Sequence, residues 1–222
     1  MEFEPKIQFH IPDWVPFLGG TGVTETVTTT WLIMALLVAF AYFSTRVLEE
    51  KPGPLQNVVE MFVESIENLT VSSMGRDKLG FAPYMGTLAM YILAANLAGL
   101  FAFRPPTADL NTTMALSFIT FASIHYYGIR RKGLLKYLKE FAEPMPLLLP
   151  LNIIGELSTP VSLSFRLFGN MLGGVIIMYL MYQMVPLILP ILPHIYFDLF
   201  AGVLQTFIFV MLSMVFISLA MD

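Results

Sequence analysis

Residues 160–174 read PVSLSFRLFGNMLGG, and about forty almost purely apolar residues follow them. The ionisable acids, bases and histidines beyond Glu143 are only Glu156, Arg166, His194, Asp198 and Asp222. Soluble proteins usually contain about 25% charged residues, whereas this chain of 222 residues has 13% charged and 56% hydrophobic residues. Because so few charges cannot cover a globule in water, we expect the chain to lie in a lipid bilayer.

Uncharged runs divide the chain into segments long enough to cross a membrane as helices, which takes about 20 apolar residues. The sequence therefore predicts an all-α membrane protein with about five crossing helices and one or two amphipathic helices on the cytoplasmic side. The predicted crossings are residues 26–45, 79–103, 110–129, 150–185 and 194–221. We assign residues 1–25 to an outside segment and residues 26–222 to a single integral membrane domain.

The run over residues 150–185 is too long to cross the bilayer perpendicularly. As a helix it would be roughly 54 Å long at 1.5 Å per residue, and the hydrocarbon core is ~30 Å thick. We expect a steep tilt, a break or a course along the membrane plane, with Pro160 as a possible kink. The cluster PLILPILP at 186–193 predicts a turn, so the last two helices should form a long, strongly tilted hairpin.

The segment after the first crossing has an apolar pattern with helical spacing. Its apolar positions are Val58, Met61, Phe62, Ile66 and Leu69. The glutamates Glu60, Glu64 and Glu67 fall on other faces, which indicates an amphipathic helix at the membrane surface or against a partner. An ordinary solvated connector helix is an equal alternative. The segment GLLKYLKEFAEP at 133–144 is predicted to be interfacial as well.

The distribution of basic residues predicts the orientation of the chain. Loops 46–78 and 130–139 contain nine of them: Arg46, Lys51, Arg76, Lys78, Arg130, Arg131, Lys132, Lys136 and Lys139. The opposite set of loops contains only Lys6 and Arg104. Because basic loops stay in the cytoplasm, we predict a multi-pass protein of a bacterial plasma membrane, with its N-terminus outside and its C-terminus cytoplasmic.

Arg166 is a charge inside the fourth predicted crossing, with no acidic residue within nine positions on either side. An arginine at the centre of a membrane helix costs about 2.5–3.5 kcal/mol on insertion scales, so such residues are usually functional. Arginine stays protonated, so Arg166 can attract a carboxylate or repel cations but cannot carry a proton. The structural alternatives are a snorkelling side chain and an ion pair with Glu156 or Asp198.

The remaining polar residues of the last two crossings can be placed by helical geometry. Their positions are Asn152, Glu156, Asn170, His194, Asp198 and Gln205. Asn152 and Asn170 fall near the face of Arg166, and Glu156 lies toward the cytoplasmic end. Asp198 lies toward the outer end, and Gln205 is predicted at the level of Arg166. These residues suit two polar ion paths separated by a fixed positive charge, although each could also be a structural hydrogen-bonding residue.

Several stretches resemble one known family. PVSLSFRLFGNMLGG closely resembles the signature of subunit a, the membrane stator subunit of F-type ATP synthases. The segments QNVVEMF (56–62), FAPYMGTLAMYILAANLAGL (81–100) and LQTFIFVMLSMVFISLAM (204–221) resemble further parts of that family. The resemblance covers nearly the whole chain after about residue 27.

The resemblance implies a stator subunit that forms two ion half-channels beside a rotor ring and couples H⁺ or Na⁺ flow to rotation. Arg166 would match the essential arginine that faces the rotor carboxylate, and Asn170 and Gln205 match polar positions near it. The implied partners are the ring of c subunits, the b subunits of the peripheral stalk, other ATP synthase subunits and membrane lipid, with no nucleic acid. The resemblance implies no catalytic chemistry in this chain, no cofactor and no metal.

The chain departs from the family pattern at three positions. Some members have a glutamate where this chain has Val175, and a histidine where it has Asp198, so the outer acidic role would rest on Asp198 with His194 one turn away. Others have a glutamate at the position of Asn152, and here Glu156 would supply that carboxylate.

Gly169 and Gly173 form a G-x-x-x-G pattern that predicts close packing, here against the rotor.

Two other functions predict different sequence features. A self-contained ion-coupled transporter predicts an inverted repeat or paired broken helices, and the sequence has neither. An intramembrane hydrolase needs a nucleophile with its base or a metal motif such as H-E-x-x-H, and no such motif occurs. The choice between H⁺ and Na⁺ stays open at this point.

Overall fold

The computed structural model describes residues 7–10, 22–46, 53–101, 103–141, 145–184 and 191–222. Four helical segments in this part of the chain are long and apolar enough to cross a membrane: Glu25–Arg46, Arg76–Phe101, Leu149–Gln183 and Ile195–Met221. The chain is therefore an all-α membrane protein, as predicted from its uncharged runs. A short antiparallel sheet of β1 (Ile7–His10) and β2 (Gly22–Thr24) precedes the first helix.

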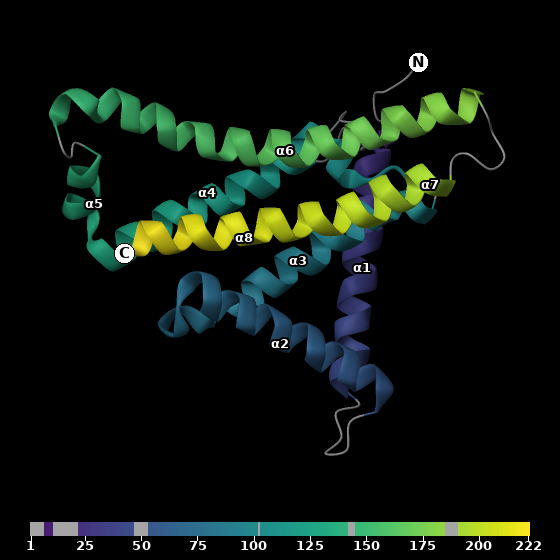
Figure 1. Cartoon of the computed structure of the whole chain (residues 1–222), viewed down its shortest axis with the longest axis horizontal. Coiled ribbons are helices and arrows are strands. Elements are labelled where there is room, and N and C mark those ends of the chain that lie inside the picture. The colour runs from purple at the N-terminus through teal and green to yellow at the C-terminus, as the bar shows by residue number, and fades with distance from the viewer. Residues whose placement is uncertain (1–6, 11–21, 47–52, 102, 142–144, 185–190) are drawn as a thin grey trace.

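The helical elements follow one another through short connections. They are α1 (Glu25–Arg46), α2 (Pro54–Met74), η1 (Arg76–Phe81), α3 (Ala82–Leu97), η2 (Ala98–Phe101), η3 (Pro106–Ala108), α4 (Leu110–Lys132), α5 (Leu134–Glu140), η4 (Pro146–Leu148), α6 (Leu149–Met184), α7 (Ile191–His194), η5 (Ile195–Ala201) and α8 (Gly202–Met221). Figure 1 shows α4, α6 and α8 running along the long axis of the molecule, while α1 crosses that direction steeply.

The third predicted crossing is a helix, α4, but it is more polar than the four apolar segments. Asp109 caps its N-terminus by accepting a hydrogen bond from the amide of Asn111 at 3.0 Å. Thr113, Ser117 and Thr120 are fully buried along one face of α4, so its polar side chains face the protein interior. That α4 crosses the membrane stays a prediction.

The long helix α6 is continuous over 36 residues, although Pro160 lies inside it. Proline has no N–H group, so the carbonyl of Glu156 lacks the amide partner that residue 160 would otherwise supply. The hydroxyl of Ser158 donates to the carbonyl of Gly155 at 2.6 Å in the same turn. Residues 186–190 of the predicted PLILPILP turn lie outside the described residues, and α7 begins at Ile191.

The amphipathic helix expected between the first two crossings is α2. Ile66 and Met74 are buried, and Phe62 and Leu69 pack against the core beside them, whereas Val58 is 61% exposed. The predicted apolar face therefore packs against the core over the C-terminal part of α2 and is exposed at the start of the helix. The interfacial segment at 133–144 contains the short helix α5.

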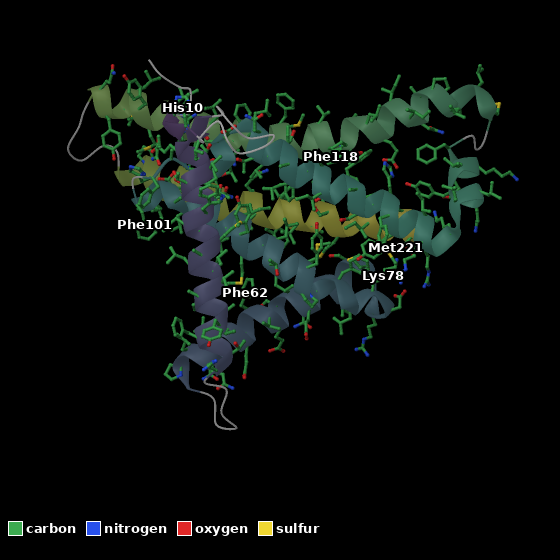
Figure 2. The ribbon with its side chains drawn as sticks, turned by 180° about the vertical axis from the view of Figure 1, so that it is seen from behind. His10, Phe62, Lys78, Phe101, Phe118 and Met221 are labelled. Carbon is green, nitrogen blue, oxygen red and sulfur yellow. The ribbon has the colours of Figure 1, made fainter. Side chains whose placement is uncertain are left out.

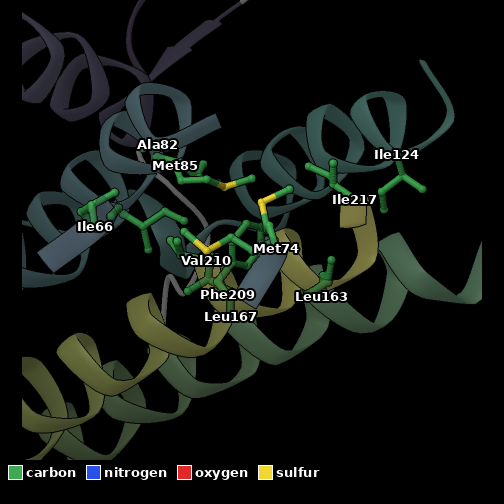
Figure 3. Close-up of a cluster of buried hydrophobic side chains, with 14 of the residues drawn as sticks. Ile66, Met74, Ala82, Met85, Ile124, Leu163, Leu167, Phe209, Val210 and Ile217 are labelled. Carbon is green, nitrogen blue, oxygen red and sulfur yellow. The ribbon is translucent and has the colours of Figure 1, made fainter. Parts of the chain in front are cut away.

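A single apolar cluster joins α2, α3, α4, α6 and α8, as Figure 3 shows around Met85, Leu167 and Phe209. These three side chains are almost completely buried. In Figure 2, Phe101 and Met221 lie toward opposite ends of the bundle, and we name the two ends after these residues.

Lys78 fastens the Met221 end of the bundle. Its side chain is buried and reaches the last turn of α8, where Nζ donates to Ser218 Oγ at 2.8 Å and to Asp222 Oδ1 at 2.6 Å. Figure 2 shows Lys78 close to Met221. The hydrogen bond from Lys78 holds the pKa of the exposed Asp222 carboxyl below its usual range. Lys78, one of the nine basic residues assigned to the cytoplasmic loops from the sequence, is thus buried and links η1 to the end of α8.

Candidate functional site

Arg166 projects from the open face of α6. Leu163, Ser164 and Leu167 of the same helix are buried against the core, whereas Phe165 and Arg166 are exposed. Within the described residues, Arg166 forms no hydrogen bond or ion pair. Neither of the two possible ion-pair partners named from the sequence, Glu156 and Asp198, contacts it in this way. The structure therefore presents a fixed cation on the surface of the chain, where a partner outside the chain can reach it.

The glycines near Arg166 leave this face of α6 unobstructed. A methyl group added at Gly155, Gly169 or Gly173 would meet no other part of the described chain within 4 Å. Asn170, four residues after Arg166, is half-buried on the edge of this face. Gly174, by contrast, packs against Phe197, whose Cβ lies 3.2 Å from the added methyl position. The G-x-x-x-G pattern thus faces away from this chain, and a neighbouring residue makes the contact with η5.

Gln205 lies on α8 and is almost completely buried. Its Nε2 atom has no hydrogen-bond partner among the described residues. A buried amide donor without a partner costs about 1–3 kcal/mol. The protein therefore maintains an unfavourable polar group in the first turn of the apolar helix α8, which is more typical of functional than of structural side chains.

A hydrogen-bonded chain of three side chains occupies the Phe101 end. His194 Nδ1 lies 2.5 Å from Asp198 Oδ2, and His194 Nε2 lies 2.7 Å from the hydroxyl of Tyr182. Tyr182 comes from α6, whereas His194 and Asp198 come from the segment before α8. The chain of hydrogen bonds thus connects an exposed tyrosine to a carboxylate whose side chain is only 14% exposed.

Asp198 sits in a π-helical segment, η5, rather than in a regular α-helix. The π-helix carries an extra residue per turn and frequently marks functional sites. The sequence pattern places Asp198 and Gln205 on one face of an α-helix, but the wider turn changes their relative phase. Asp198 consequently approaches η2, where its Oδ1 lies 2.9 Å from the position that a Cβ would take if Gly99 carried a side chain.

A polar cavity of about 450 Å³ lies at the Met221 end, against α6. Its polar lining residues are Lys132, Tyr137, Glu140, Asn152, Glu156 and Thr159. Lys132 Nζ pairs with Glu140 Oε2 at 2.7 Å, and Asn152 Nδ2 donates to the carbonyl of Phe141 at 2.9 Å. The first contact holds α5 against α4, and the second holds the end of the α5 region beside α6, so the cavity exists because α5 folds back toward the bundle.

Tyr137 is the best-buried polar side chain of this cavity. Its hydroxyl lies 2.7 Å from His125 Nδ1. Burial, followed by the negative charges of Glu156 and Glu140, raises the pKa of Tyr137 to about 12. Tyr137 therefore stays a neutral hydrogen-bonding group next to Glu156 throughout the physiological pH range.

Apart from Gln205 on α8, the predicted site residues fall into three groups along α6 and the segment before α8. Asn152 and Glu156 line the cavity at the Met221 end, whereas His194 and Asp198 lie at the Phe101 end. Arg166 and Asn170 lie between them along α6. The described part of the chain contains no cluster of three or more histidine, aspartate or glutamate residues that could hold a metal ion.

Sequence reasoning missed Tyr137, Tyr182 and Gly99. Tyr137 lies in a segment that the pattern marks only as interfacial, and Tyr182 is one of several aromatic residues near a predicted membrane boundary. Gly99 adjoins the site only because η2 packs against η5. A search for tyrosines near the ends of the long helices would have found the first two residues, but no local signal identifies Gly99.

Comparison with known proteins gives a consistent result. The model of the family described as ATP synthase A chain matches residues 27–218. The chain is 43% identical over 206 residues to ATP synthase subunit a 1 of Syntrophotalea carbinolica, covering 90% of this chain and 87% of that protein. It is 38% identical over 202 residues to ATP synthase subunit a of Moorella thermoacetica, covering 90% and 92%. It is 35% identical over 241 residues to a protein of Propionigenium modestum named ATP synthase subunit a, sodium ion specific, covering 96% and 83%.

Proposed function

Because the chain belongs to the ATP synthase A chain family, we propose that its two polar ends are ion half-channels separated by Arg166. The chain is an ion-translocating membrane subunit of the ATP synthase complex and not a catalytic subunit. It acts as a stator subunit that couples ion flow to rotation. The observation that carries the proposal for individual residues is the exposed Arg166, which pairs with no described residue and lies between two polar sites.

The open face of α6 is the proposed rotor surface. Arg166 stands there beside Gly169 and Gly173, whose added methyl groups would meet nothing in the described chain. A rotor helix can approach closely at such small residues. When a rotor carboxylate passes Arg166, the fixed positive charge favours its ionised form, so that the bound ion is released. The same charge repels cations and prevents a direct leak between the half-channels.

The inner half-channel is the proposed role of the cavity at the Met221 end. Glu156 supplies its carboxylate, and Asn152 and Tyr137 supply neutral hydrogen-bonding groups. The carbonyl of Glu156, which Pro160 deprives of its i+4 amide donor, is proposed as a further acceptor. Such a cavity admits water, which an ion needs before it can leave the membrane.

The outer half-channel is the proposed role of the Phe101 end, where His194 and Asp198 meet. Gln205 and Asn170 are the proposed polar residues between this end and Arg166. The excess of basic residues in loops 46–78 and 130–139 supports the orientation, with the Met221 end in the cytoplasm of a bacterial cell. The proposed partners are the c-subunit ring, the b subunits of the peripheral stalk and the other ATP synthase subunits.

The test replaces Arg166 in the assembled ATP synthase. We expect Arg166→Ala to reduce ATP-driven ion pumping in inverted membrane vesicles to background, because ions then pass or stall without turning the rotor. Arg131→Ala is the matched control, since Arg131 is an exposed arginine at the end of α4. Co-purification of the catalytic subunits reports assembly. Pumping by assembled Arg166→Ala at the wild-type rate would refute the proposal.

A further inference from the structure

We propose that Tyr182 and Gly99 are positioning residues of a proton-accepting site at the Phe101 end, and that the ion taken up there is a proton. The inference rests on the proposed outer half-channel and deepens it. It is carried by the hydrogen-bonded chain Tyr182–His194–Asp198 and by the close approach of Asp198 to Gly99.

The Tyr182 hydroxyl can hold the His194 ring in both of its protonation states. When Nε2 is unprotonated, the hydroxyl donates to it across the 2.7 Å contact. When Nε2 carries a proton, the ring donates and the hydroxyl oxygen accepts, because a phenol serves in either role. The ring therefore need not move as it gains a proton, and Nδ1 remains 2.5 Å from Asp198 Oδ2.

The geometry supports a complete proton step. Nε2 takes a proton from external water, so that an N–H bond forms there, and the Tyr182 hydroxyl turns from donor to acceptor while keeping its own proton. The imidazolium then loses its Nδ1 proton to Asp198 Oδ2, so that an O–H bond forms on the carboxylate. The net result is one proton moved from water to Asp198, with His194 neutral again as its Nε2–H tautomer and Tyr182 unchanged.

These side chains suit a proton better than a sodium ion. Hard cations bind several oxygen ligands at once, whereas both ring nitrogens of His194 are already engaged in hydrogen bonds. The Asp198 side chain is 14% exposed and lies directly against Gly99. A proton can enter by exchange along existing hydrogen bonds, but a sodium ion would have to displace them.

Gly99 provides the space for the Asp198 carboxylate. A Cβ at residue 99 would lie 2.9 Å from Oδ1 and 3.1 Å from Cγ of Asp198. Any larger residue must therefore push the carboxylate away from its place beside His194. Gly99 thus fixes Asp198 from one side while Tyr182 fixes His194 from the other.

The ionisable surroundings of the pair are few. The elements packed against η5 are α6, α7, α8, α3 and η2. Apart from His194 itself, on α7, their ionisable side chains are Glu156, Arg166, Tyr179 and Tyr182 on α6, with Tyr84 and Tyr91 on α3. Tyr196 is the other ionisable residue of η5 itself. Among the described residues, Tyr182 is the one that hydrogen-bonds to the His194–Asp198 pair.

The first experiment measures passive proton flux through membrane sectors stripped of their catalytic subunits. We expect Tyr182→Phe to lower the flux roughly fivefold, the effect of losing about one hydrogen bond from the transfer step. The remaining flux should shift to lower pH, because the hydroxyl stabilises the charged ring more than the neutral ring. Tyr196→Phe is the control, since Tyr196 is exposed and hydrogen-bonds to no described residue. Unchanged flux and pH profile in assembled Tyr182→Phe would overturn the proposal.

The second experiment approaches Asp198 from the opposite side. Gly99→Ala should lower proton flux at least as strongly as Tyr182→Phe, whereas Gly80→Ala should not, because Gly80 has open space around it. Failure of either site variant to assemble would mean that its contact serves the fold, and would overturn the positioning role. Wild-type pumping that requires sodium ions would overturn the proton assignment. If that pumping were also abolished by Arg166→Ala, the proposed function would survive and this inference alone would fail.

Discussion

Asn96 on α3 is the residue whose replacement tests the polar packing of the bundle most directly. Its side chain is fully buried and forms three hydrogen bonds with two other elements. Nδ2 donates to the carbonyl of Gly202 at 3.0 Å and to Thr206 Oγ1 at 3.1 Å, and Oδ1 accepts from Thr107 Oγ1 at 2.7 Å. Asn96→Ala removes all three bonds and leaves the buried Thr107 hydroxyl without this acceptor.

The magnitude follows from these contacts. Hydrogen bonds between membrane helices average about 0.6 kcal/mol, and those in soluble proteins about 1 kcal/mol. Losing three of them should therefore cost roughly 2–3 kcal/mol. For a chain of this size, each kcal/mol corresponds to about 2–4 °C in the unfolding midpoint, so we expect a decrease of about 4–12 °C.

The assay heats vesicles that contain the assembled complex and then measures ATP-driven pumping at a fixed temperature. Thr87→Ala is the matched control, because Thr87 is an exposed residue of the same helix whose hydroxyl bonds only to Pro83. Its midpoint should stay within about 2 °C of the wild type. An Asn96→Ala midpoint equally close to the wild type would refute the reasoning, since it would mean that the buried network contributes no stability.

Four further predictions concern other contacts. Gly128→Ala should lower stability by about 1–3 kcal/mol, because the new methyl group would lie 2.7 Å from Tyr137 and 3.1 Å from the Ala220 carbonyl; a thermal midpoint equal to that of Gly80→Ala would contradict this. Lys78→Met should lower the free energy of unfolding by about 1–3 kcal/mol, because it leaves the Ser218 hydroxyl without its lysine partner. Because the pKa of Asp222 is lowered, its contribution to stability is fully present above its ordinary pKa of about 3.8 and is lost as the pH falls through the lowered pKa. The stability difference between wild type and Asp222→Asn should therefore shrink in acid. Gly169→Leu should leave the thermal midpoint unchanged, because the site is open, but should abolish ATP-driven pumping by blocking the proposed rotor surface; normal pumping would argue against that surface.

Much of the architecture could be predicted because membrane insertion depends on local composition. The uncharged runs place the ends of α1, α4 and α6 within three residues of those observed. Arg166 stands out for the same reason, since a lone cation in an apolar helix is costly wherever that helix packs. The resemblance of residues 160–174 to a known family then indicates the function, which the comparisons support over almost the entire chain.

The contacts around these helices could not be predicted, because they join residues far apart in the sequence. Lys78 and Asp222 are 144 positions apart, and Asn96 and Thr206 are 110 apart. The π-helical turn at Asp198 changes the direction of the carboxylate, which regular helical spacing cannot anticipate. The sequence by itself determined which segments are apolar enough to cross a membrane and singled out Arg166 as the charge among them, since hydropathy and charge are local properties. Only the packing of η2 and α6 against η5, and of α5 against α4, decided that Gly99, Tyr182 and Tyr137 border the polar sites, because side-chain neighbours depend on how separate helices fit together.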